Sequence, residues 1–167
     1  GISIYTSSQF INRLILKNSF IDINEIDILT LIGRNQITPN YKLLKKNILN
    51  KNVLVTGAGG SIGSELARQI SELKPSKLIL LENNEFALYQ INKELKQNDI
   101  QNNRKLKIIS LLGSVLDEDR VSSIIEKYNP FVIFHAAAYK HVPIVEENPG
   151  EAVKVNVFGT QNLLNLV

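Results

Sequence analysis

From residue 51 onward, short apolar runs alternate with longer segments in which apolar residues recur at helical spacing. Nearly continuous apolar runs predict buried strands, and the longer periodic segments predict helices with one buried face. The predicted strands are 52–56, 77–81, 106–112 and 131–135. The predicted helices are 61–73, 84–96, 116–127 and 151–167, with a polar loop at 99–104. This alternation indicates a parallel sheet that is covered by helices on both faces.

The expected fold class is therefore α/β, a doubly wound, Rossmann-like parallel sheet that is truncated after about four strands. On its first helix, the spacing places four apolar side chains on the buried face. They are Ile62, Leu66, Ile70 and Leu73.

Residues 1–50 lack this alternation and are expected to form a connector or N-terminal extension to a main domain at 51–167. Helical spacing recurs at 9–17, alternation at 20–28 allows a short strand, and a short helix is predicted at 41–49. The sequence contains no Met and stops at Val167 inside an apolar helical pattern. We therefore expect an internal, incomplete piece of a longer protein.

Composition excludes several classes of function. The chain has 167 residues, of which 44% are hydrophobic and 21% charged, as expected of a globular domain. It lacks Cys and holds two histidines, so neither a Cys nucleophile nor a metal site is expected. The net charge of +3 arises within residues 1–50 and is too scattered to predict nucleic-acid binding. The longest apolar stretch, near 131–139, is too short to span a bilayer.

A glycine turn joins the first predicted strand to its helix. Its glycines follow the spacing G-x-x-G-x-x-G, in the strand–turn–helix context of the dinucleotide fingerprint. Positions without a Cβ let a phosphate approach the backbone, and the helix N-terminus favours its negative charge. We therefore expect a pyrophosphate site at Gly57, Gly60, Ser61, Ile62 and Gly63.

Glu82 ends the second predicted strand, 25 residues after Gly57. An acidic residue there accepts hydrogen bonds from the adenosine ribose, and Asn83 is placed in the same site. A carboxylate repels a 2′-phosphate, and residues 83–85 contain no Lys or Arg, which favours NAD over NADP. The alternative is a solvated carboxylate at a strand end.

Residues after the third and fourth strands complete the expected cofactor site. Ser114 and Val115 are expected to border the adenine, although an ordinary strand-to-helix turn is an equal alternative. The small side chains of Ala136, Ala137 and Ala138 would let a cofactor lie against the backbone, and the alternative is that they only fill the core.

Three further residues lie near this end of the fourth strand. Lys140 and His141 are candidates for substrate contact just past the sheet edge. His135 is more typical of a half-buried, hydrogen-bonded histidine than of a catalyst.

A Tyr-x-x-x-Lys pair would supply the proton-transfer dyad of a short-chain dehydrogenase, because Lys lowers the phenol pKa. Tyr41 with Lys45 precedes the glycine turn, and Tyr89 with Lys93 follows the second strand, away from the nicotinamide end. Neither match fits. The main acid/base residues are therefore expected after a fifth strand, beyond Val167.

Together these blocks resemble the extended short-chain dehydrogenase/reductase superfamily. More narrowly, the chain is similar to its capsular-polysaccharide biosynthesis branch, the UDP-N-acetylglucosamine 4,6-dehydratases. The residues that carry the resemblance are 31–34, 39–40, 53–65, 80–89, 135–143, 146–149 and 155–164.

The resemblance implies a reaction in which bound NAD oxidises the sugar C4 hydroxyl, water leaves across C5–C6, and the hydride returns to C6. The product is a 4-keto-6-deoxy sugar for bacterial glycans, and the Asn at position 156 supports the active site. It further implies that the complete protein is anchored in the membrane and works at the cytoplasmic face of the inner membrane. The fragment itself would then be soluble and inactive. Independently of the resemblance, the open sheet edge where a fifth strand would pair is expected to favour homo-oligomers.

Two other functions remain open. Another extended short-chain enzyme, such as a nucleotide-sugar 4-epimerase, would share this cofactor-binding half. A non-catalytic NAD-binding module would share it too, without acid/base residues after it.

Overall fold

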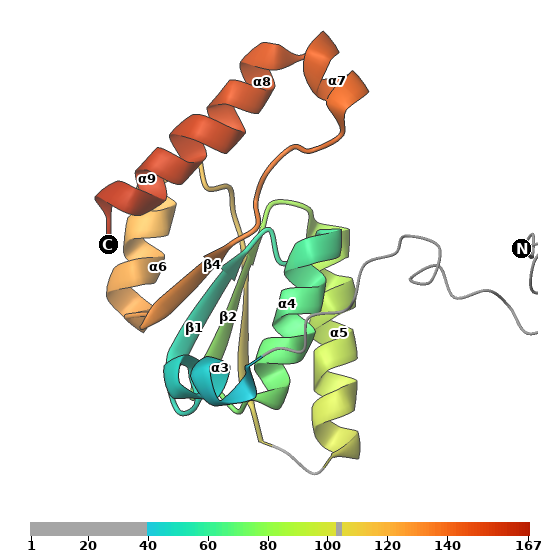
Figure 1. Cartoon of the computed structure of the whole chain (residues 1–167), viewed down its shortest axis with the longest axis vertical. Coiled ribbons are helices and arrows are strands. Elements are labelled where there is room, and N and C mark those ends of the chain that lie inside the picture. Colours follow the sequence, from blue (N-terminus) through green and yellow to red (C-terminus); the bar gives the residue numbers. More distant parts are fainter. Residues whose placement is uncertain (1–39, 103–104) are drawn as a thin grey trace, which may run out of the picture. The chain divides into compact units, whose positions relative to one another are not determined.

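Four parallel strands form the centre of the structure, a computed structural model that describes residues 40–102 and 105–167 (Figure 1). The strands are β1 (Asn52–Thr56), β2 (Lys77–Glu82), β3 (Lys107–Leu112) and β4 (Val132–His135). Their order in the sheet is β3-β2-β1-β4. This confirms the predicted parallel, Rossmann-like sheet. The helical spacing at 9–17 and the possible strand at 20–28 lie outside the described residues.

The register aligns the carboxyl ends of the strands. Leu54 of β1 lies opposite Ile79 of β2 on one side and opposite Ile133 of β4 on the other. Backbone bonds continue the ladder past the strand ends, from the Ala58 N–H to the Leu81 carbonyl and from the Ala136 N–H to the Thr56 carbonyl. The loops after the strands are therefore held close together along one edge of the sheet.

Helices cover both faces of the sheet, as Figure 1 shows for α4 and α5 on one side and for α6 and α9 on the other. The helices before the fourth strand are α3 (Tyr41–Ile48), α4 (Ser61–Glu72), α5 (Glu85–Gln101) and α6 (Glu118–Tyr128). After it come α7 (Val142–Glu147), α8 (Pro149–Val153), the π-helical segment η1 (Lys154–Phe158) and α9 (Gly159–Asn165).

Alternate side chains of the strands build two separate cores. Val53 and Val55 point to the face covered by α4 and α5, whereas Leu54 points to the face covered by α6 and α9. All three are completely buried. A fully buried side chain of this kind contributes about 1.5–3 kcal/mol relative to an exposed one. The nearly continuous apolar strands of the sequence are thus explained by burial on both faces.

Local sequence determines where the helices begin. The Asn84 side chain accepts the Ala87 N–H and caps α5, and the Asp117 side chain accepts the Arg120 N–H and caps α6. The predicted start of α6 at residue 116 is therefore two residues too early.

Three other sequence predictions were wrong in detail. Helix α5 continues to Gln101, so residues 99–101 are helical instead of forming a loop. There the Asp99 carboxylate accepts the Leu106 N–H at 3.1 and 3.2 Å, which ties the helix to the approach of β3. Ile62 is 58% exposed, because it lies in the first turn of α4, past the sheet edge. The last predicted helix begins at Pro149, not at residue 151, and contains a π-helical segment.

The compact unit described here runs from Asn40 to Val167. It includes α3, whose Ile48 is buried in the core on the α4 and α5 side. The division into 1–50 and 51–167 stays a prediction. Within 40–102 and 105–167, we find no helix with the length and apolar character needed to cross a bilayer.

Candidate functional site

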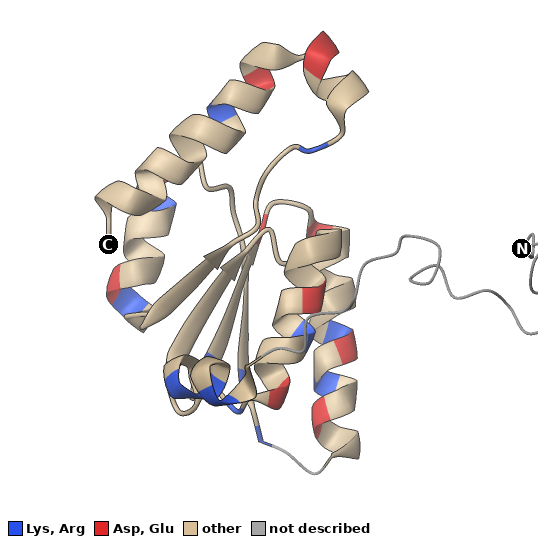
Figure 2. Cartoon of the chain, in the orientation of Figure 1, with Lys and Arg blue, Asp and Glu red and all other residues tan. Residues whose placement is uncertain are grey.

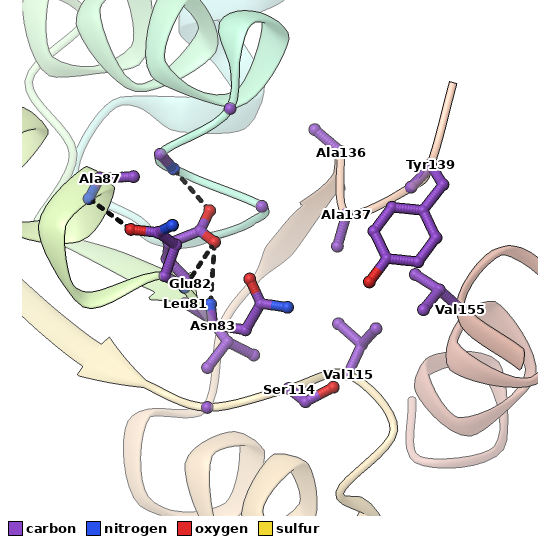
Figure 3. Close-up of a pocket in the computed structure, with 16 residues that line it drawn as sticks. Leu81, Glu82, Asn83, Ala87, Ser114, Val115, Ala136, Ala137, Tyr139 and Val155 are labelled. Carbon is purple, nitrogen blue, oxygen red and sulfur yellow. Dashed lines mark hydrogen bonds between the residues drawn. The ribbon is translucent and has the colours of Figure 1, made fainter. Parts of the chain in front are cut away.

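A cleft of about 290 Å³ opens at the carboxyl edge of the sheet (Figure 3). This volume is near the lower end of the range of about 300–1,000 Å³ for small-molecule pockets. Its lining comes from the end of β2, from the segments that follow the four strands, and from η1. The lining residues are Gly57, Gly59, Gly60, Leu81, Glu82, Asn83, Asn84, Ala87, Gly113, Ser114, Val115, Ala136, Ala137, Ala138, Tyr139 and Val155.

The glycine turn packs backbone to backbone against its surroundings. Gly57 has φ +63°, and a Cβ there would lie 2.6 Å from the Ala137 nitrogen and 2.7 Å from the Ala136 carbonyl oxygen. A Cβ on Gly63 would overlap the carbonyl group of Gly57. Both positions therefore require glycine, the first for conformation and for space and the second for close helix–turn packing.

The first turn of α4 offers backbone donors beside the cleft. The Gly60 N–H bonds to the Gly57 carbonyl at 3.1 Å, and the Ser64 N–H bonds to the Gly60 carbonyl at 2.8 Å. The N–H groups of Ser61, Ile62 and Gly63 have no acceptor within the helix, and no side chain of the described residues caps this end. These three donors and the helix dipole suit a phosphate.

The Glu82 carboxylate is buried at the opposite side of the turn, with the residue 7% exposed. Its Oε2 accepts the Gly59 N–H at 2.8 Å, and its Oε1 accepts the N–H groups of Asn83 and Asn84 at 2.9 and 3.0 Å (Figure 3). It is therefore not the solvated carboxylate that the sequence left open. A carboxylate has about four lone-pair sites, so one remains for a further donor such as a hydroxyl group.

Tyr139 lies on the side of the cleft away from Glu82 (Figure 3). The Asn156 side chain holds its backbone at two points. Oδ1 accepts the Tyr139 N–H at 2.8 Å, and Nδ2 donates to the Tyr139 carbonyl at 2.9 Å. Asn156 belongs to η1, so this segment fixes the loop that follows β4.

His135 bonds through both ring nitrogens. Nδ1 lies 2.7 Å from the Thr56 hydroxyl, and Nε2 lies 3.0 Å from the Thr160 hydroxyl. Partial burial lowers the pKa of the ring, which favours the neutral form. The ring is thus partly buried between its two hydrogen-bond partners, as the sequence predicted. The predicted hydrogen-bonded character agrees with these contacts.

The structure brings together part of the predicted site. The predicted residues that line the cleft are Gly57, Gly60, Glu82, Asn83, Ser114, Val115, Ala136, Ala137 and Ala138. The predicted residues that do not line it are Ser61, Ile62, Gly63, Lys140, His141 and Asn156. Their individual roles stay predictions.

Gly113 also lines the cleft and belongs to the same predicted adenine loop as Ser114 and Val115. Sequence reasoning missed other lining residues, which are Gly59, Leu81, Asn84, Ala87, Tyr139 and Val155. Two of them could have been predicted from the motifs already used, because Gly59 lies inside the glycine turn and Tyr139 directly follows the alanines. Val155 carried no such signal, because only the fold brings η1 to the cleft.

Comparison with known proteins gives one family match. The sequence profile of the family described as "Polysaccharide biosynthesis protein" matches residues 53–167. The probable polysaccharide biosynthesis protein EpsC of Bacillus subtilis is 39% identical over 163 residues, which cover 98% of this chain and 27% of that protein. A UDP-N-acetylglucosamine 4,6-dehydratase (inverting) of Campylobacter jejuni is 36% identical over 116 residues, 69% of this chain and 32% of that enzyme.

A solved structure shares the fold. The UDP-glucose 4-epimerase of Brucella ovis, solved in complex with NAD, matches with a TM-score of 0.54 and 28% identity. The match covers 70% of this chain and 31% of the epimerase. The chain thus spans about a quarter to a third of the length of these proteins. These matches confirm the resemblance seen in the sequence.

Proposed function

Because the chain belongs to the polysaccharide biosynthesis protein family, we propose that it is the NAD-binding part of a nucleotide-sugar 4,6-dehydratase. The observation that carries the proposal is the cleft lined by the glycine turn and the buried Glu82 carboxylate, beside which α4 begins with three N–H groups that have no acceptor within the helix. Support for the reaction class comes from the similarity to the Campylobacter dehydratase. Support for the cofactor comes from the epimerase that was solved with NAD.

The residues of the cleft fit the parts of a dinucleotide. The amides of Ser61, Ile62 and Gly63 would hold the pyrophosphate, for which Gly57 leaves backbone space. Ser114 and Val115 would border the adenine. The alanines at 136–138 and Tyr139 would hold the nicotinamide half. When bound there, NAD supplies reversible hydride transfer.

Glu82 would select NAD over NADP. One lone-pair site of its carboxylate remains for a ribose hydroxyl, beyond the three bonds to backbone N–H groups. A 2′-phosphate at the same place would meet a buried negative charge that the turn holds rigidly. In addition, Asn83, Asn84 and Glu85 offer no cationic side chain for such a phosphate.

For the complete protein, we propose the conversion of UDP-N-acetylglucosamine to a 4-keto-6-deoxy sugar at the cytoplasmic face of the membrane. Lys140 and His141 are the proposed substrate contacts, and Asn156 is a supporting residue, because its side chain fixes the loop that ends in them. The complete protein is proposed to be membrane-anchored and to form homo-oligomers.

A nucleotide-sugar 4-epimerase is the second candidate, favoured by the similarity to the Brucella epimerase. NMR of the full-length protein with UDP-N-acetylglucosamine and NAD separates the two. A 4-keto-6-deoxy product is expected, a C4 epimer would favour the second candidate, and turnover to neither would contradict both.

Calorimetry tests the cofactor independently of turnover. We expect the full-length protein to bind NAD more tightly than NADP, and Glu82→Ala to reduce that preference. Glu72→Ala, an exposed position at the end of α4, is the matched control. Equal affinity of the unmodified protein for both cofactors would contradict the proposed role of Glu82.

A further inference from the structure

A continuous chain of hydrogen bonds links the end of β1 to η1 through His135. The Thr56 hydroxyl lies 2.7 Å from His135 Nδ1, and His135 Nε2 lies 3.0 Å from the Thr160 hydroxyl. The Thr160 hydroxyl in turn donates to the Asn156 carbonyl at 2.7 Å. Thr56 is completely buried, so one end of this chain is fixed in the core.

The bond from the Thr160 hydroxyl to the Asn156 carbonyl determines which atoms donate and which accept in the other two bonds. A hydroxyl has one hydrogen, and Thr160 gives it to the Asn156 carbonyl, so Thr160 must accept from His135 Nε2. Nε2 therefore carries the proton of the neutral ring, and Nδ1 accepts the Thr56 hydroxyl hydrogen. The ring is thus specified as a single tautomer by its two neighbours.

The chain of bonds ends at the residue that holds the cleft wall. Asn156 is fixed through its carbonyl by Thr160, and its side chain bonds to both the N–H and the carbonyl of Tyr139. Tyr139 lines the cleft opposite Glu82 (Figure 3). Asn156 also lies in a π-helical segment, a rare geometry that is frequent at functional sites.

We propose that His135 and Thr160 are positioning residues, which fix Asn156 and thereby hold Tyr139 in place against a ligand in the cleft. Neither residue lines the cleft itself. Their effect is confined to the wall away from Glu82, so they act on the half of a dinucleotide that lies beyond the pyrophosphate. The proposal rests on the proposed function for the identity of that ligand.

The test compares a whole and a truncated ligand in the full-length protein. Thr160→Val removes the hydroxyl at nearly constant size, and Thr160→Ser keeps it. We expect Thr160→Val to weaken NAD binding about three- to tenfold, the effect of one net hydrogen bond, and to leave ADP binding unchanged. Thr160→Ser should bind NAD within about twofold of the unmodified protein. Ser123→Ala, on the exposed side of α6, is the control.

Each outcome decides the proposal. Unchanged NAD affinity in Thr160→Val, or an equal loss for NAD and ADP, overturns the positioning role and leaves the proposed function standing. Binding of neither ligand by the unmodified protein overturns both. Nitrogen-15 NMR of the imidazole adds a measurement without variants, in which the Nε2–H tautomer is expected and the Nδ1–H tautomer would overturn the proposal.

Discussion

Glu82 holds the glycine turn through the N–H of Gly59, whose nitrogen lies 2.8 Å from the carboxylate Oε2. The two residues are 23 positions apart, and the bond ties the end of β2 to the turn after β1. The turn itself carries no charged side chain, as Figure 2 shows for the described residues. Its shape therefore depends on a carboxylate supplied by the neighbouring strand.

Glu82→Gln is expected to destabilise the fold even without ligand. An amide can accept through only one of its two polar atoms, so at least one of the three backbone N–H groups loses its acceptor. Because these bonds are only partly buried, the loss of one of them is expected to lower the free energy of unfolding by about 0.5–1.5 kcal/mol. Urea denaturation measures the loss, with Glu72→Gln as an exposed control. Equal stability of the two variants would contradict the tie between β2 and the turn.

Gly63→Ala is expected to destabilise the protein by about 1–3 kcal/mol, the usual cost of overpacking, because its Cβ would overlap the Gly57 carbonyl group. Gly150→Ala is the matched control. No atom lies within 4 Å of a Cβ there, and the residue lies in the first turn of α8, so little change or a small gain in stability is expected. Thermal unfolding compares the two, and a similar effect of both variants would refute the packing argument.

Stability should depend on the protonation of His135. Its pKa is lowered below the ordinary 6.5 in the folded state, so the unfolded chain binds more protons between the two values. Protonation of His135 therefore costs no stability above about pH 6.5. Below that pH the free energy of unfolding decreases, and the decrease continues until pH has fallen through the pKa of the folded state. His135→Gln should flatten this part of the stability profile in denaturation series from pH 7.5 to 5.5. A variant with the same slope as the unmodified protein would contradict the assignment.

The Arg68–Glu94 pair should contribute modestly to the packing of α4 on α5. Arg68 Nε lies 2.6 Å from Glu94 Oε1, and a second bond of 3.0 Å joins Nη2 to Oε2. The guanidinium lowers the pKa of Glu94, but both side chains are about 40% exposed. Glu94→Gln should therefore cost only about 0.2–1 kcal/mol, and less at high salt. Glu151→Gln, which breaks a more exposed pair with Lys154, is the control. A loss that is independent of salt would argue against an ionic contribution.

The sheet was predictable because burial on both faces leaves nearly continuous apolar runs in the sequence. The start and end of β1 were predicted to the residue, and β2 and β3 within one. The glycine turn was predictable for a different reason, since Gly57 and Gly63 stand where a Cβ would overlap backbone. Both signals are local and do not depend on distant partners.

The wall of the cleft away from Glu82, which Tyr139 and Val155 line, could not be predicted from local sequence patterns. Helix α7 is exposed along its whole length apart from Val145 and lacks a buried apolar face that would give a periodic signal. The π-helical segment at 154–158 is hydrogen-bonded to the loop after β4 through Asn156 and Tyr139, which are 17 positions apart in the sequence. Tyr139 and Val155 enter the cleft only through that arrangement.

The cleft is assembled from segments between residues 57 and 155, one after each strand. No single strand–helix unit contains both of its walls, so the cleft exists only when all four strands have paired in register. Ligand binding would therefore report on completion of folding, and a bound ligand would stabilise the whole sheet by mass action. Gradual loss of one outer strand would abolish binding before it abolished the helical signal in circular dichroism. Occupancy of the cleft is thus a stricter criterion of correct folding than secondary-structure content.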